Sequence, residues 1–280
     1  MMQLFIVEGN KQHLDGGSMF GNAPKALWNK WIPADAHNRI PLACRCLLVR
    51  TPQGRQVLFE TGIGAFFEPK LKERFGVYET QHVLLENLAA LGVKEEEIDA
   101  VVLSHLHFDH AGGLLTAYGE KMRLHFPKAR YYLGREHWAR AKNPHIREQV
   151  SFIPQIQELL ADSGRLVLIE GSHCAELDFG VRFHYSHGHT IGLMLAELEL
   201  PEGPLVFVSD LVPGIPWVHL PIVMGYDRFP ELTVDEKRKL FEDLHKRKGR
   251  LFFTHDPQTP VVKLGMEGNR YTAEPTALSH

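Results

Sequence analysis

The sequence has few cysteines, and none of them has the spacing of a structural metal site. Only Cys44, Cys46 and Cys174 occur, and no CxxC pair is present. Cys44 and Cys46 stand two apart in an apolar run, so their side chains point to the same side of a strand and cannot bridge easily. A disulfide framework, a zinc ribbon and a thioredoxin-type site are therefore not expected, and a reducing cytoplasm is the expected compartment.

Long apolar runs and a strong charge of one sign are also absent. No run approaches the roughly 18 to 20 apolar residues that span a bilayer, and the first ten residues lack the pattern of a signal peptide. The formal net charge of −3 gives no electrostatic reason to expect nucleic acid or an anionic membrane surface as a partner. The sequence has no GxSxG, GxxxxGK[ST] or HExxH motif, so serine-hydrolase, P-loop and zincin chemistry lack support.

The elements that are present predict an α/β protein. With 280 residues, 44% of them hydrophobic, the chain has material for a substantial core, and without repeats or long linkers we expect one domain over 1–280. Short apolar runs that alternate with helical patterns predict two mixed sheets with helices outside. Strands are expected at 4–7, 44–50, 56–59, 98–103, 130–133, 166–169, 181–185, 193–198, 205–208 and 251–254. Helices are expected at 80–91, 135–142, 153–160 and 233–246, the last with Thr233 as N-cap and Glu236 completing a capping box.

Histidine is abundant, with seventeen residues, and several histidines cluster. His105, His107, Asp109 and His110 follow directly on the apolar run 98–103. In an extended loop, side chains at i and i+2 face the same way, so His105 and His107 can bind one ion while Asp109 and His110 turn toward a second.

Three further metal-competent residues share a position in the pattern. His189, Asp210 and His255 each come just beyond an apolar strand, and strand ends gathered at one sheet edge are where α/β proteins form their sites. Imidazole and carboxylate without thiolate suit zinc, and also iron, manganese or cobalt. We therefore expect two divalent metal ions as cofactors.

These four elements, HxHxDH at 105–110 with Gly188-His189, Ser209-Asp210 and Thr254-His255, resemble the metallo-β-lactamase superfamily. The resemblance spans residues from about 40 to 256, in the family's order. It implies an αββα sandwich of two mixed β-sheets flanked by helices. It further implies that one ion is held by His105, His107 and His189, a second by Asp109, His110 and His255, and that Asp210 bridges them.

Within that superfamily the chain is similar to the lactonase-like branch, which includes the N-acyl-homoserine lactonases of quorum quenching. The similar segments are 15–21, 38–42, 60–64 and 224–230. The chain departs from the pattern at Glu60, where many members have Asp, and at 191–193, where many have a second His. It departs again at Pro213, where well-studied homoserine-lactone hydrolases carry a Tyr.

The expected chemistry is hydrolysis. Two close ions hold a bridging hydroxide at neutral pH, which would open a lactone or a related ester. Asp109 is expected to shuttle the proton to the leaving alkoxide, with pure metal ligation as the alternative, and Tyr226 to contact the substrate. Glu60 and Thr61 are expected to orient ligand imidazoles, and His187 is a further candidate for this role.

Some alternatives stay open on the residues alone. Phosphotriester or thioester hydrolysis fits the same ligand set, and so does a single-iron sulfur dioxygenase. The substrate is expected to be a small, partly apolar molecule. Aromatic residues in irregular segments can wall its pocket, pack in the core or serve a homodimer interface: Phe20, Trp28, Trp31, Trp217 and Tyr226.

Overall fold

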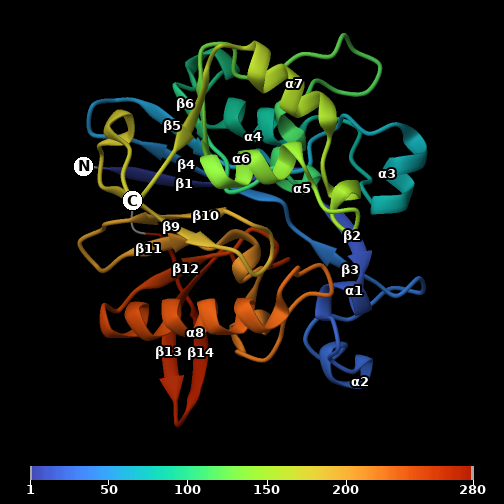
Figure 1. Ribbon diagram of the computed structural model, residues 1–280, viewed down its shortest axis with the longest axis vertical. Helices are drawn as coiled ribbons and strands as arrows, with labels where there is room; N and C mark the ends of the chain where they lie inside the picture. The colour runs from blue at the N-terminus through green and yellow to red at the C-terminus, as the bar shows by residue number, and fades with distance from the viewer. Residues whose placement is uncertain (1, 279–280) are drawn as a thin grey trace. The chain divides into compact units, whose positions relative to one another are not determined.

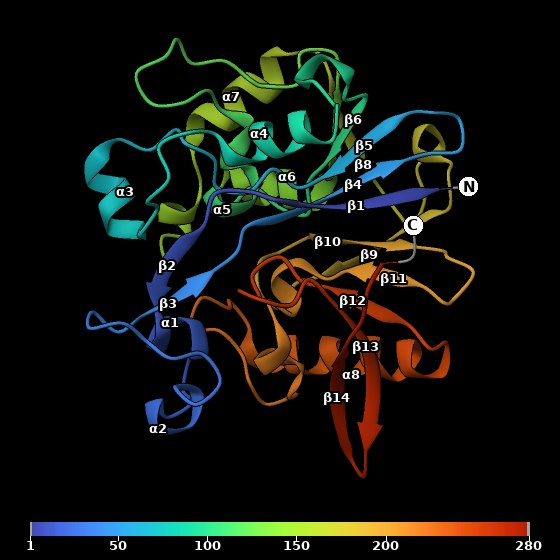
Figure 2. The same cartoon turned by 180° about the vertical axis from the view of Figure 1, so that it is seen from behind.

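The computed structural model describes residues 2–278, and the chain divides into two compact units. The first unit comprises the residues up to 12 together with 43–170, and the second comprises 13–42 and 171–278. Each unit contains a six-stranded sheet, helices and a hydrophobic core (Figure 1, Figure 2). The organisation of 1–280 as one domain stays a prediction.

The sheet of the first unit has the strand order β1-β4-β5-β6-β7-β8. Its strands are Gln3–Glu8, Arg45–Arg50, Gln56–Phe59, Ala100–Val102, Arg130–Gly134 and Leu166–Ile169. β1, β4 and β5 pair antiparallel, and the predicted hairpin of β4 and β5 is confirmed. β5, β6, β7 and β8 pair parallel. The residues that follow β5, β6 and β7 therefore emerge at one edge of this sheet.

Five α-helices belong to the first unit: α3 Pro69–Phe75, α4 Val83–Ala90, α5 Phe108–Ala111, α6 Arg135–Lys142 and α7 Pro154–Asp162. In α4 and in α7 the buried residues are four apart, Leu84 with Leu88 and Ile156 with Leu160, so each pair lies on one helix face. These faces pack into the same core as Leu58. The 3₁₀ helices are η1 Glu95–Glu97, η2 Gly112–Leu114 and η3 Gln149–Ser151.

The sheet of the second unit has the order β14-β13-β12-β11-β10-β9. Its strands in chain order are Val181–Ser186, Leu193–Leu198, Leu205–Phe207, Arg250–Phe252, Val261–Glu267 and Arg270–Pro275. All neighbours are antiparallel except β11 and β12, which are parallel. β9, β11 and β12 consequently run in the same direction. The remaining 3₁₀ helices are η4 Ala175–Leu177, η5 Ser209–Leu211 and η6 Ile215–Val218.

Helix α8, Pro230–Lys246, packs along the second unit's sheet, and its Phe241 and Leu244 lie in the core with Val262 (Figure 1). The predicted N-cap at Thr233 is wrong. The helix begins at Pro230, whose fixed φ suits the first helical position. Thr233 is thus in the helix interior, and the capping box with Glu236 does not form.

Residues 13–42, between β1 and β4, fold with the second unit. β2 Gln12–Asp15 pairs with β3 Arg39–Leu42, and α1 Gly16–Phe20 and α2 Lys25–Trp28 lie between them in sequence. The ring of Phe20 stacks on Trp28 and Trp217, with centroids 5.4 and 4.6 Å apart. These three rings are buried, and Trp31 is 38% exposed. Phe20, Trp28 and Trp217 therefore pack in the core, and Trp31 lies at its surface.

Candidate functional site

The histidine-rich segment of the first unit lies at the edge where β5 and β6 end. His105 follows β6, and His107 is the extended residue that precedes α5. Asp109 and His110 lie within the single turn of α5, so the predicted extended conformation is wrong from Phe108 onward.

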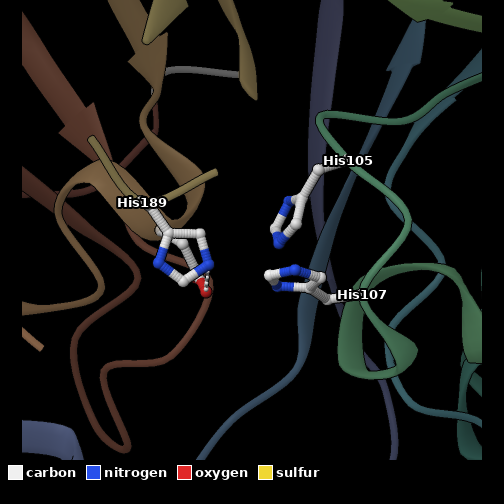
Figure 3. Close-up of side chains that lie close together, drawn as sticks. His105, His107 and His189 are labelled. Carbon is white, nitrogen blue, oxygen red and sulfur yellow. Dashed lines mark ion pairs between the residues drawn. The ribbon is translucent and has the colours of Figure 1, made fainter. Parts of the chain in front are cut away.

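The first unit brings its four predicted ligands together. The ring centroids of His105 and His107 are 4.4 Å apart and those of His105 and His110 are 4.0 Å apart. Nε2 of His110 lies 3.8 Å from Oδ1 of Asp109. None of the four residues is more than 8% exposed. Figure 3 shows His105 and His107 projecting from the same loop.

Polar neighbours fix which ring nitrogens can face a metal. Nδ1 of His105 lies 2.8 Å from the hydroxyl of Ser104. Nε2 of His107 lies 3.2 Å from Oε1 of Glu148, a buried carboxylate that also accepts from Nε of Arg140 at 2.7 Å. Because a carboxylate can only accept, Nε2 of His107 carries the proton, and Nδ1 is the nitrogen that can face a metal. Because Nδ1 of His105 contacts Ser104, its Nε2 is the nitrogen that can face a metal.

Glu60 is placed beside the histidines, as the sequence predicts. Its Oε1 accepts from the backbone N–H of Ser104 at 2.9 Å, and its Oε2 lies 3.6 Å from Nδ1 of His110. Glu60 is fully buried with a φ of 66°, a strained conformation of the kind that gathers at functional sites. Thr61 acts on the backbone instead, because its hydroxyl donates to the carbonyl of His110 at 3.0 Å.

Asp109 has one close neighbour that the sequence does not suggest. Nε2 of Gln12 donates to its Oδ2 at 2.6 Å, across 97 residues of sequence. Both side chains are buried. A hydrogen bond to one carboxylate oxygen restricts the rotation of Asp109 and leaves its Oδ1 as the atom nearer His110.

The second unit brings its three predicted ligands together through strand direction. β9, β11 and β12 run the same way, and His189, Asp210 and His255 follow them in that order. Oδ2 of Asp210 lies 3.2 Å from Nε2 of His189, and Oδ1 lies 3.1 Å from Nε2 of His255. The carboxylate thus lies between two imidazoles, and all three residues are at most 5% exposed.

Asp227 is a functional residue that the sequence reasoning missed. Its Oδ1 lies 2.9 Å from Nδ1 of His189, and its Oδ2 accepts from the backbone N–H of Met224 at 3.2 Å. The side chain is 1% exposed. It therefore fixes the ring of His189, drawn in Figure 3, with Nδ1 protonated and Nε2 toward Asp210. The only signal in the sequence was its place in the segment 224–230.

The remaining candidates have other surroundings. Tyr226 is 37% exposed and adjoins Asp227 in sequence. His187 holds a turn, because its Nδ1 accepts from the N–H of Gly192 at 3.2 Å. A hollow of about 520 Å³ lies within the second unit, and Trp31, His219 and Tyr271 are among the residues that line it. Asp256 lines it as well, directly after His255 in the chain.

The two ligand sets fit divalent metal ions. Buried imidazoles and carboxylates at contact distance are a typical N/O donor set, and a bound cation would stabilise carboxylates that are otherwise costly to bury. The donor atoms of Glu60, His105 and His110 lie within 4.8 Å of one another. Carboxylates against Nε2 of His107 and Nδ1 of His189 are the outer partners that metal-binding histidines generally have.

Comparison with known proteins is consistent with this site. The profile of the metallo-β-lactamase superfamily matches residues 39–255. An N-acyl homoserine lactonase of Bacillus cereus is 25% identical over 243 residues, which cover 78% of this chain and 83% of that protein. One of Bacillus thuringiensis is 24% identical and covers 75% and 80%.

Solved structures share the fold over the whole chain. A probable metal-dependent hydrolase from Staphylococcus aureus has a TM-score of 0.88 at 25% identity and covers 100% of this chain and 98% of that one. AidC, a dizinc quorum-quenching lactonase solved with the product N-hexanoyl-L-homoserine, has a TM-score of 0.79 at 22% identity and covers 100% and 96%.

The chain therefore belongs to the metallo-β-lactamase superfamily, in its lactonase-like branch. The predicted fold class is confirmed, with mixed sheets flanked by helices. The protein is an enzyme of the hydrolase class that binds divalent metal ions. Among residues 2–278, no helix is long and apolar enough to cross a membrane.

Proposed function

We propose that the protein is a dinuclear metal-dependent hydrolase that opens the lactone ring of a small, partly apolar molecule. The observation that carries the proposal is the position of Asp210, whose two carboxylate oxygens face two different imidazoles at 3.2 and 3.1 Å. A carboxylate that faces two histidines in this way is suited to bridge two ions, one bound by each histidine.

The proposed ligands come from both units. One ion is assigned to His105, His107 and His189, the second to Asp109, His110 and His255, and Asp210 is shared. The first set offers three imidazoles, and the second offers two imidazoles and the carboxylate of Asp109. Each is a donor set that suits a divalent ion. When bound, two such ions supply hydroxide at neutral pH and polarise a carbonyl oxygen. We propose zinc for both, since zinc binds imidazole and carboxylate and AidC is named a dizinc enzyme.

Residues of the chain perform the other parts of the reaction. Asp109 is assigned to carry a proton to the alkoxide oxygen that leaves when the ring opens. Gln12 supports this role, because its hydrogen bond to Oδ2 fixes the carboxylate and keeps Oδ1 toward His110. Tyr226 is assigned to a polar contact with the substrate, supported by its partial exposure next to Asp227.

The substrate class rests on the relatives. The curated relatives are N-acyl homoserine lactonases, and the AidC structure contains an acyl-homoserine product. We propose quorum quenching as the role on that basis. A cytoplasmic location is proposed because all three cysteines are free thiols. A homodimer is also proposed, with the exposed ring of Trp31 in the interface.

A substrate panel tests the proposal. Purified protein would be assayed on N-acyl homoserine lactones of increasing acyl length, simple lactones, thioesters and phosphotriesters, before and after chelation. Lactone opening that is lost on chelation and returns with added zinc is the expected result. The Asp210→Asn variant should lose that activity, and Asp162→Asn, at an exposed position, should retain it.

Other outcomes identify the alternatives. Faster cleavage of thioesters or phosphotriesters than of any lactone would keep the metal chemistry and contradict the substrate. One iron per chain with oxygen uptake on persulfide, and no hydrolysis, would contradict the hydrolase and favour a sulfur dioxygenase.

A further inference from the structure

One face of helix α8 is directed at the loops that hold His189. Glu236 and Lys237 lie three and four residues after Thr233, so each is a neighbour of Thr233 on the helix surface. Thr233 and Lys237 are buried, at 1% and 0% exposure. Their neighbours Arg238 and Lys239 are exposed. Burial of a lysine and a threonine at this spacing needs an explanation beyond helix packing, because both carry polar atoms into the interior.

Glu236 binds the loop that follows β9. Its carboxylate accepts from the hydroxyl of Ser186 at 2.6 Å and from the backbone N–H groups of His187 and Gly188 at 2.8 and 3.1 Å. Three hydrogen bonds to an ionised group are among the stronger polar contacts in proteins. They fix the backbone up to the residue directly before His189.

Gly188 lets this loop approach the helix closely. A Cβ at Gly188 would lie 2.3 Å from Oγ1 of Thr233 and 2.5 Å from its backbone nitrogen. The carbonyl of Gly188 accepts from the N–H of Phe229 at 2.8 Å, and that of His189 accepts from the N–H of Arg228 at 3.2 Å. The loop is therefore held directly against the start of α8.

Lys237 binds the second loop, which carries the partner of His189. Its Nζ donates to the carbonyls of Trp217 and Ile222 at 3.0 and 2.6 Å. Burial lowers the pKa of Lys237 to about 7, although the nearby charge of Asp227 raises it. This loop continues to Met224, whose N–H donates to Asp227. The ammonium thus fixes the chain just before the carboxylate that faces Nδ1 of His189.

We propose that Glu236 and Lys237 are positioning residues that orient the imidazole of His189 toward the metal. Glu236 fixes the loop that carries the histidine, and Lys237 fixes the loop that carries Asp227. The loops that carry His189 and Asp227 are consequently both hydrogen-bonded to the same helix, α8. The proposal rests on the proposed function only in taking His189 as a metal ligand.

Metal affinity and a cobalt spectrum test this proposal on the full-length chain. Glu236→Gln and Lys237→Met would be compared with Glu242→Gln and Lys239→Met, which make the same changes at exposed positions of the same helix. Zinc affinity would be measured by competition with a chromophoric chelator, the ligand field by the visible spectrum of the Co²⁺-substituted protein, and folding by Tm.

We expect Glu236→Gln to weaken the binding of one ion about tenfold and to change the Co²⁺ spectrum, because the loop before His189 is no longer fixed; the loss is at the low end of the roughly 10- to 100-fold cost of removing a direct partner of a metal ligand. The second ion should keep its affinity, and both control variants should match the wild type. If Lys237→Met does not fold, Glu236→Gln alone decides the proposal.

A lower Tm for Glu236→Gln with unchanged zinc affinity and an unchanged Co²⁺ spectrum would overturn the proposal, because the residue would then be structural only. That result would leave lactone hydrolysis by the wild type untouched. A wild-type chain that binds no zinc and no Co²⁺ would overturn this proposal together with the proposed function.

Discussion

At the scale of single residues, the predicted metal ligands follow local patterns in the sequence, whereas two of the carboxylates that contact them do not. His105, His107, Asp109 and His110 stand within six positions, a local spacing that itself indicates a metal site. Glu148 and Asp227 are lone acids in loops, 41 and 38 residues from the histidines they contact. No local pattern marks such residues, because only the fold brings them to their partners.

Glu148 is predicted to maintain metal affinity through His107. In Glu148→Gln the acceptor for the protonated Nε2 is weakened and Arg140 loses its ionic partner. Zinc affinity should fall about 10- to 100-fold, as for other outer-sphere partners, in a chelator competition assay. The control is Glu158→Gln, which changes an exposed residue nearby in the chain. Equal affinities for both variants would contradict the assignment.

Asp109 is predicted to contribute to kcat rather than to the binding of substrate. Asp109→Asn removes the group assigned to protonate the leaving oxygen, so kcat on a lactone should fall about 100-fold or more with KM little changed. Rates are to be compared per metal-loaded chain, with metal content determined on the same sample. A variant that keeps both ions and the wild-type kcat would leave Asp109 as a ligand only.

Gly113 is predicted to be intolerant of any side chain. A Cβ there would lie 2.0 Å from the carbonyl oxygen of Thr61, so the backbone beside His110 must shift. Gly113→Ala should lower the free energy of unfolding by about 3 kcal/mol or more, measured by denaturant titration. Gly171→Ala, with φ of 74° but open space around it, measures strain alone and should cost about 1 kcal/mol. Similar losses for both would refute the steric argument.

At the scale of elements, the presence of a strand was easier to predict than the residue at which a helix begins. The runs at 56–59, 166–169 and 193–198 are mostly apolar and occur in the structure with those bounds. The hairpin of β13 and β14 was missed because β14 has no buried residue and β13 ends in two exposed ones, so the pair shows no clear apolar alternation. The start of α8 was misplaced because Thr233 with Glu236 satisfies a capping-box pattern, whereas Pro230 starts the helix and Glu236 binds the loop at 186–188.

The end of α8 is connected to the sheet by a buried charge. Glu197 of β10 accepts from Arg247 at 2.7 and 2.8 Å and lies 2.9 Å from Nε2 of His184. Burial raises the pKa of Glu197, but the hydrogen bonds from Arg247 and His184 outweigh it, and the pKa falls from 4.5 to about 2.

The lowered pKa of Glu197 predicts an acid-sensitive contribution to stability. Because the folded-state pKa lies below the unfolded value, the stabilisation is present above about pH 4.5 and is lost as the pH falls toward about 2. The contribution is on the order of 2 to 3 kcal/mol. Glu197→Gln should be less stable at pH 7 and lose less stability between pH 5 and pH 3, in denaturant titrations at each pH. Parallel pH profiles for variant and wild type would contradict this account.

At the scale of the whole molecule, the predicted ligands are divided between the two units. The first unit contains four of them, in a loop and a single helical turn, and the second contains three, which follow strands that run in the same direction. The family and fold followed from the order of these motifs along the chain. The substrate did not, because its contacts depend on exposed residues such as Tyr226 whose roles no motif defines.

The most direct test of a dinuclear hydrolase is a zinc titration of metal-free protein, followed by the rate of lactone opening. The account predicts that activity rises until two ions are bound per chain and that Asp210→Asn gains little from either. Full activity with one ion per chain, or lactone opening without any metal, would contradict it.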